Sequence, residues 1–150
     1  MIAYPDTSFL CALYRRQDNS RAAAAHFKTM PEALHVSSLL LFEFRQSLRF
    51  QVWLHAQNPN KGFPQTDCDA ALGKLQLNMD MGAVVIVPVD WPDVYRLAER
   101  LSVRNTGANG HRGFDVLHVA TALHLGVREF LTFDTNQRKL AVAEKLKVKP

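Results

Sequence analysis

Four short apolar segments alternate along this chain with longer stretches of helical periodicity. These segments are Ile2–Tyr4, Leu34–Val36, Val84–Val87 and Phe130–Phe133. Alternation of this kind is typical of βαβ units, in which a crossover helix makes neighbouring strands run parallel. The sequence therefore predicts an α/β fold with a central, mainly parallel sheet of four to five short strands, the last of them an edge strand near Lys147-Val148.

Helical segments are expected in the intervals between these strands. They are predicted at Thr7–Tyr14, Ala22 to about Met30, Leu39–Ala56, Thr66 or Asp67 to Met81, Pro92–Val103, Asp115–Leu125 and Thr135–Glu144. Ser37 or Ser38 is the expected N-cap of the long third helix. Two stretches rich in Asn, Gly and Pro, Asn58–Pro64 and Asn105–Gly110, are predicted to be loops, the second of them flexible.

Length and composition indicate one ordinary globular domain. The chain has 150 residues, 47% of them hydrophobic, and its net charge of +4 is compatible with a polyanionic partner without requiring one. No apolar run approaches the roughly 18 residues of a membrane span, and no signal-peptide pattern is present, so a cytoplasmic location is expected. Cys11 and Cys68 lie in no zinc-binding pattern, and Cys11 is predicted to be a core residue.

Three acidic residues stand where a strand or a loop gives way to a helix. Asp6 follows the first strand, Asp115 follows a glycine-rich stretch, and Asp134 follows the fourth strand. Taken singly, each is explained as a helix N-cap, and Gln137 would complete a capping box with Asp134. Asp90 has a similar setting and is assigned the capping role alone. Partners elsewhere in the chain are needed to give the other three a chemical role.

A fourth acid, Glu43, lies inside an apolar helix rather than at its start. The positions three and four residues away hold Leu39, Leu40, Gln46 and Ser47, so the helix itself offers Glu43 no basic partner. An acid on an apolar face is costly to bury unless another group binds it. A metal ion is one such group. An arginine from elsewhere in the chain, or exposure of the side chain at the surface, is the alternative.

These four acids are expected to converge. Right-handed crossovers in a parallel sheet bring the starts of the following helices to the same edge. Carboxylates gathered there would repel one another unless a cation neutralises them, and a set of oxygen ligands favours Mg²⁺ or Mn²⁺ over zinc. The sequence therefore predicts metal-assisted attack of water on a phosphodiester.

Four stretches resemble the successive motifs of the PIN-domain family, in order and over nearly the whole chain. They read "YPDTSFL", "VSSLLLFEF", "GFDVLHVATAL" and "FLTFDTNQRKLA". The small size resembles the VapC-type toxin branch. The resemblance implies a three-layer α/β/α sandwich and a Mg²⁺- or Mn²⁺-dependent endoribonuclease. Its metal site would consist of Asp6, Glu43, Asp115 and Asp134.

The resemblance also implies a nearby hydroxyl and a set of partners. The hydroxyl beside the first acid corresponds to Thr7 or Ser8, with Ser8 the better match. Proteins of the VapC type are usually homodimers that cleave RNA and are inhibited by a small antitoxin protein, so these partners are expected here. The chain differs from the family pattern at Pro5 and in a longer Gln51–Met81 stretch.

Several other residues near the acids have two interpretations each. Arg112 is either an RNA phosphate contact or a solvated loop residue. Asn136 either contacts a metal-bound water or takes part only in local turn bonding. His118 lies one turn after Asp115 and is predicted to be a packed core histidine. Arg45 and Arg49 form a basic stripe on the Glu43 helix, which either steers RNA or simply faces solvent.

Other functions compete with the nuclease hypothesis. A PIN-like protein-interaction module without chemistry would keep the same fold. A phosphatase of the haloacid-dehalogenase type also has an acid after its first strand, but it requires a second acid where this chain has Ser8. A phospho-receiver domain would leave Glu43 without a role. Hydrolysis of RNA therefore remains the favoured prediction.

Overall fold

The structure, a computed structural model, describes all 150 residues, and strands and helices alternate along them as predicted. The strands are β1 (Ala3–Pro5), β2 (Leu34–Val36), β3 (Val84–Ile86), β4 (Glu129–Leu131) and β5 (Lys147–Lys149). The helices are α1 (Thr7–Tyr14), α2 (Ser20–Thr29), α3 (Ser38–Gln57), α4 (Gln65–Asp80), α5 (Trp91–Asn109), α6 (Gly113–His124) and α7 (Thr135–Ala143). None of the helices combines the length and apolar character needed to cross a membrane.

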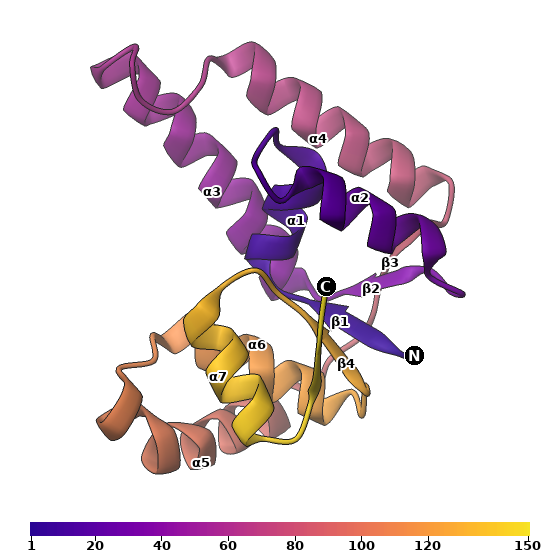
Figure 1. The fold of residues 1–150 in the computed structure, drawn as a ribbon, viewed down its shortest axis with the longest axis vertical. Coiled ribbons are helices and arrows are strands. Elements are labelled where there is room, and N and C mark those ends of the chain that lie inside the picture. Colours follow the sequence, from indigo (N-terminus) through magenta and orange to yellow (C-terminus); the bar gives the residue numbers. More distant parts are fainter.

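Every paired strand runs parallel to its neighbour. β1 pairs with β4 and β4 with β5, while β2 pairs with β3. β1 and β2 also lie side by side, so the order across the molecule is β3-β2-β1-β4-β5. In Figure 1, α1, α2 and α4 lie above the strands and α5, α6 and α7 below them. The predicted α/β fold with a parallel sheet between helices is confirmed.

The ends of β1 and β4 define the edge where the first acid lies. Tyr4 pairs with Phe130 and Pro5 with Leu131. Pro5 has no N–H to donate, and the next bond of the ladder runs from the N–H of Asp6 to the Leu131 carbonyl, at 2.9 Å. Asp6 is therefore held directly beyond β1 and beside the end of β4.

A buried hydroxyl pair sets the position of α3 relative to β1. Tyr4 is fully buried, and its hydroxyl lies 2.6 Å from the Ser37 hydroxyl. Ser37, rather than Ser38, caps α3 by accepting a bond from the Leu40 N–H at 3.2 Å. Because the cap and the strand share this contact, the first turns of α3, which carry Glu43, start beside β1.

One predicted loop is in fact helical. The prediction of a flexible loop at Asn105–Gly110 is wrong, because α5 continues to Asn109 and is capped by Gly110, whose φ is 66°. The Asn105 side chain donates to the Leu101 carbonyl at 3.0 Å and to Glu144 at 3.2 Å. These contacts join the last turns of α5 to the end of α7, so tertiary packing overrides the weak helix propensity of this stretch.

Smaller differences concern the ends of elements and the two cysteines. β4 ends at Leu131, before Thr132 and Phe133, which were expected to continue the strand. The Thr132 hydroxyl instead donates to Asp6, and the Phe133 N–H donates to the Ser8 hydroxyl. Cys11 and Cys68 are both buried and unpaired, and the core position predicted for Cys11 is confirmed.

The second half of α3 and α4 form a helical hairpin that projects from the sheet (Figure 1). The loop Asn58–Pro64 joins the two helices and folds back onto α3. Gly62 has a φ of 60°, and a Cβ placed there would come within 2.0 Å of the Gln51 carbonyl oxygen. His55 Nδ1 also lies 3.2 Å from the Lys61 carbonyl oxygen. The loop is therefore packed against the helix and not free in solvent.

We expect Gly62→Ala to destabilise the protein by about 1–3 kcal/mol, because a left-handed φ and a backbone collision both oppose the added methyl group. Gly73 is the matched control, since it lies in exposed α4 with open space around it. Gly73→Ala should stabilise the protein by about 0.5–1 kcal/mol. Urea denaturation measures both values, and equal effects of the two substitutions would contradict the close packing of this loop.

Candidate active site

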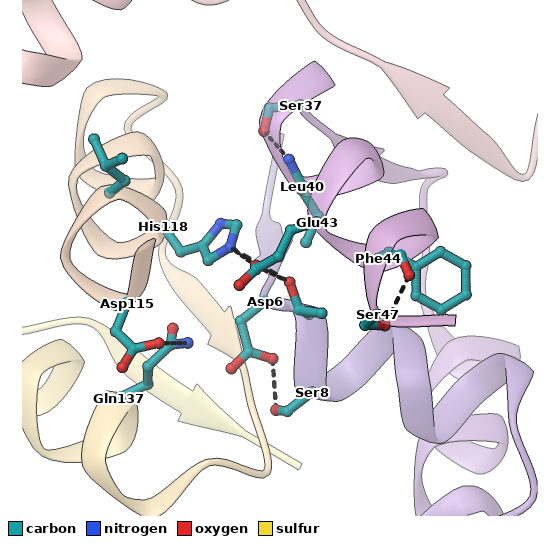
Figure 2. A network of polar contacts seen from close by, with 12 residues as sticks. Asp6, Ser8, Ser37, Leu40, Glu43, Phe44, Ser47, Asp115, His118 and Gln137 are labelled. Carbon is teal, nitrogen blue, oxygen red and sulfur yellow. Dashed lines mark hydrogen bonds and ion pairs between the residues drawn. The ribbon is translucent and has the colours of Figure 1, made fainter. Parts of the chain in front are cut away.

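Three of the predicted acids face a common space beyond the carboxyl ends of the strands (Figure 2). Asp6 follows β1, Glu43 projects from the second turn of α3, and Asp115 lies in the first turn of α6. Asp134 follows close after β4, at the start of α7. The hydrogen bond that Arg112 donates to Asp115, and then the charges of Asp115, Asp134 and Glu43, raise the pKa of Arg112. One exposed guanidinium therefore lies within electrostatic reach of three of the four acids.

Asp6 is the most deeply buried of these acids, with no exposed surface. One carboxylate oxygen accepts bonds from the Ser8 hydroxyl at 2.6 Å and the Phe9 N–H at 2.9 Å, and the other accepts from the Thr132 hydroxyl at 2.5 Å. Burial raises the pKa of Asp6 to about 6, although these three bonds favour the charged form. The Asp6 charge is thus solvated only by neutral donors and lacks a cation in direct contact.

Two hydroxyl groups join Asp6 to the segment that follows β4. Thr132 donates to Asp6 and accepts a bond from the Asp134 N–H at 2.9 Å. Ser8 accepts a bond from the Phe133 N–H at 2.8 Å. Thr132 was missed in the sequence analysis, although a polar residue inside the apolar run "FLTF" was a visible signal.

Asp134 caps α7, but the predicted capping box is only half formed. Its carboxylate accepts bonds from the N–H groups of Asn136 and Gln137, both at 2.8 Å. The Gln137 side chain does not return to the cap and instead donates to Asp115 at 3.1 Å. The predicted reciprocal contact is therefore wrong, because buried Gln137 satisfies an acid of the neighbouring helix. The bond of Asn136 is a local turn bond made by its backbone N–H, and the metal-water contact of its side chain stays a prediction.

Asp115 is not the N-cap that the sequence suggested. α6 begins at Gly113 with Arg112 in the cap position, so Asp115 is the third residue of the helix and points inward. It is 5% exposed, and its second oxygen lies 3.1 Å from the Nε of Arg112. The Arg112 side chain is 78% exposed, so a buried acid is paired here with a cation that solvent reaches freely.

Glu43 finds its partner in a histidine and not in an arginine. His118 Nε2 lies 2.5 Å from one Glu43 oxygen, and the Thr7 hydroxyl donates to the same oxygen. Burial raises the pKa of Glu43, but the hydrogen bond and charge of His118 outweigh it and leave this pKa lowered. His118 has no exposed surface, as predicted for a packed histidine, and it also positions Glu43.

The acids fit a hard divalent cation in their chemistry, although they are not arranged around one in this structure. No three His, Cys, Asp or Glu side chains are placed to hold an ion together. Carboxylate oxygens are nevertheless the ligands that Mg²⁺ and Mn²⁺ prefer. Arg112, which is exposed, contacts one oxygen of Asp115, and buried Asp6 is a carboxylate that a cation would stabilise.

Comparison with known proteins identifies the family. The model of the PIN domain matches residues 3–143. The chain belongs to the PIN domain family. The resemblance of the four sequence motifs to the PIN family is therefore confirmed, and the acids described above lie within the matched region. A search of curated proteins found no match for this PIN domain protein.

Solved structures with the same fold include toxins of the VapC type. The Mycobacterium tuberculosis VapC20, a Sarcin-Ricin loop cleaving toxin, is 19% identical with a TM-score of 0.63, and the match covers 99% of each chain. VapBC2 of Rickettsia felis, solved with a promoter DNA fragment, is 10% identical with a TM-score of 0.66, over 99% of this chain and 98% of that one. FitAcB of Neisseria gonorrhoeae is 17% identical with a TM-score of 0.64, over 100% and 97%. At these identities the likeness concerns the fold.

We expect Asp6→Asn to stabilise the folded protein at pH 8 by about 2–3 kcal/mol, because the amide keeps the shape and removes a buried charge. The folded pKa of about 6 lies above the ordinary value of 3.8. The contribution of Asp6 to stability is therefore fully present below pH 3.8 and is lost as pH rises through 6. Urea denaturation of both proteins between pH 4 and 8 measures this, and a difference that does not change with pH would contradict the buried, charged Asp6.

Proposed function

We propose that this PIN domain protein is a metal-dependent endoribonuclease that acts as the toxin of a toxin–antitoxin pair in the cytoplasm. The observation that carries the proposal is the gathering of Asp6, Glu43 and Asp115 around one space in a chain of the PIN family. Neutral side chains would suffice for a purely structural helix start. Buried carboxylates with one movable cationic partner are better suited to holding a cation and a phosphate.

In this proposal Asp6 and Asp115, with Glu43 and Asp134, hold Mg²⁺ or Mn²⁺. The bound ion supplies an activated water and offsets the charge of the scissile phosphate. The hydroxyl donors around Asp6 keep its carboxylate in one orientation. The contact of His118 with Glu43 lowers the pKa of that acid and so favours its ionised form.

Arg112 has a second role in the same proposal. Its guanidinium pairs with Asp115 in the present structure and is largely exposed. The guanidinium would contact a non-bridging oxygen of the RNA phosphate, for which the planar fork of Arg is well suited. Arg112 would therefore act as a resident counter-ion of the acids before substrate binds.

The proposed partners are RNA, a cognate antitoxin and a second copy of the chain. Two structural neighbours are described as VapBC proteins, one bound to promoter DNA and one from Haemophilus influenzae. An apolar groove at the start of α3 and α5 supports a protein partner. Exposed Phe42 and Tyr95 line this groove together with Leu39 and Trp91.

A catalytically silent PIN-fold interaction module is the second candidate. The absence of any three side chains placed to hold one ion favours this candidate, because it argues against a preformed metal site. The two candidates differ in a measurable way, because only the enzyme needs its carboxylates for RNA cleavage.

We expect the purified protein to cleave single-stranded RNA in the presence of Mg²⁺ or Mn²⁺, and Asp6→Asn and Asp115→Asn to lower the rate at least about 100-fold, because each removes a charge that the ion requires. Asp90→Asn is the matched control, since Asp90 caps α5 and lies outside the cluster. Its rate should equal that of the wild type. Equal cleavage by all four proteins, or by none, would reject the nuclease proposal.

Binding of the ion is testable without RNA. We expect 10 mM Mg²⁺ or Mn²⁺ to raise the melting temperature of the wild-type protein, because a ligand that binds only the folded state stabilises it. The rise should disappear in Asp6→Asn and Asp115→Asn and persist in Asp90→Asn. Thermal melts with and without EDTA measure the effect. A rise of the same size in all the variants would show that the ion binds elsewhere.

A further inference from the structure

A second polar cavity lies away from the acids, on the projecting helical hairpin. It has a volume of about 470 Å³ and is bounded by the end of α1, the middle of α3, the Asn58–Pro64 loop and α4. Three cationic side chains line it, Arg15, Arg16 and Lys74, against the single acid Asp67. The lining therefore has an excess of positive charge, which favours an anionic ligand.

Arg15 is the most constrained of these cations. Its guanidinium carbon lies 5.2 Å from the centre of the Phe63 ring, and its Nε is buried without a hydrogen-bond partner. A buried N–H of a charged group without an acceptor is costly, and an oxyanion bound to the Arg15 guanidinium would offset that cost. The arginine is thus held in place by an aromatic ring while a donor remains free.

The walls of the cavity are built from packed elements. The close approach of Gly62 to Gln51 fixes the loop on α3. The Asn78 side chain donates to the Tyr14 hydroxyl at 2.9 Å and so joins α4 to the end of α1. A ligand entering the cavity would therefore meet a site that already exists.

Two helices connect this cavity with the acids. α1 begins with Thr7, which contacts Glu43, and ends with Tyr14 at the cavity. α3 carries Glu43 near its start and Gln51 eight residues later, which corresponds to about 12 Å along the helix axis. A stacked nucleic-acid strand covers that distance in about three to four nucleotides.

We propose that this cavity binds a backbone phosphate of the RNA strand, about three to four nucleotides from the bond that is cleaved at the acids. The inference rests on the proposed nuclease function and adds a second contact for the substrate. Arg15 and Arg16 bind the phosphate oxygens, Lys74 adds a third positive charge, and the partly exposed Phe63 ring offers a surface for a base. The longer hairpin of this chain would thereby hold the RNA in register.

The test compares two double variants with the same change in charge. Arg16→Ala/Lys74→Ala removes two exposed cations of the cavity, and Arg128→Ala/Lys28→Ala removes two exposed cations near the opposite edge of the sheet. Fluorescence anisotropy with a labelled 12-nucleotide RNA measures binding in the presence of EDTA. We expect the cavity variant to bind about tenfold more weakly and its salt slope to fall by about 0.7, the contribution of one phosphate contact in a single strand. Binding by the other variant should change less than twofold.

Cleavage of two substrates separates this inference from the proposed function. A dinucleotide is too short to reach the cavity, so the wild type and the cavity variant should cleave it equally. The 12-nucleotide RNA should show a raised KM with the cavity variant. Failure of the wild type to cleave either substrate would reject the nuclease function. The comparison of RNA binding by the two double variants would still test whether the cavity binds RNA.

Three results would overturn the inference itself. One is equal RNA binding by the two double variants. Another is a cavity variant that cleaves the dinucleotide and the 12-nucleotide RNA with the same relative loss. The third is a cavity variant that no longer binds inorganic phosphate or AMP, which the wild type binds, but still binds RNA. This result would assign the cavity to a free nucleotide or phosphate.

Discussion

The arrangement of this molecule depends on one buried carboxylate at the junction of two parallel strands. Asp6 lies directly beyond β1, and its N–H completes the ladder with β4 because Pro5 has none to offer. Neutral donors from α1 and from Thr132 solvate the charge, but burial still raises its pKa to about 6. An amide of the same shape would avoid the free-energy cost of burying this charge. The carboxylate at this position is therefore explained by function and not by stability.

Asp115 and Glu43 are each held by a neighbour from a different helix. Asp115 is held by Arg112 and Gln137, and Glu43 by Thr7 and His118. Gln137 and His118 are buried and Thr7 is half-buried, whereas Arg112 is exposed. In the proposed function, this set of carboxylates beside one exposed cation is the resting state, from which the site would accept an ion and a phosphate.

The short strands, the long helices and the four acids were all visible in the sequence, because strand–helix alternation and helix caps are local signals. The failures have physical causes. Asn105–Gly110 was predicted to be a loop from its composition, but contacts of Asn105 with α5 and α7 keep it helical up to Asn109. Gln137 matched the spacing of a capping box, yet its side chain bonds to Asp115 on another helix. Spacing describes neighbours along the chain and not neighbours across the sheet.

By itself, the sequence determined that this is an α/β chain of the PIN type and which carboxylates stand at the ends of its strands. Only the tertiary structure decided the partners of those carboxylates. Thr132 and His118 contact Asp6 and Glu43, which lie 126 and 75 residues away in the chain, and no local pattern encodes such pairs. The basic cavity between α1, α3 and α4 arose in the same way, because its cations come from segments that meet only when the hairpin packs against α1.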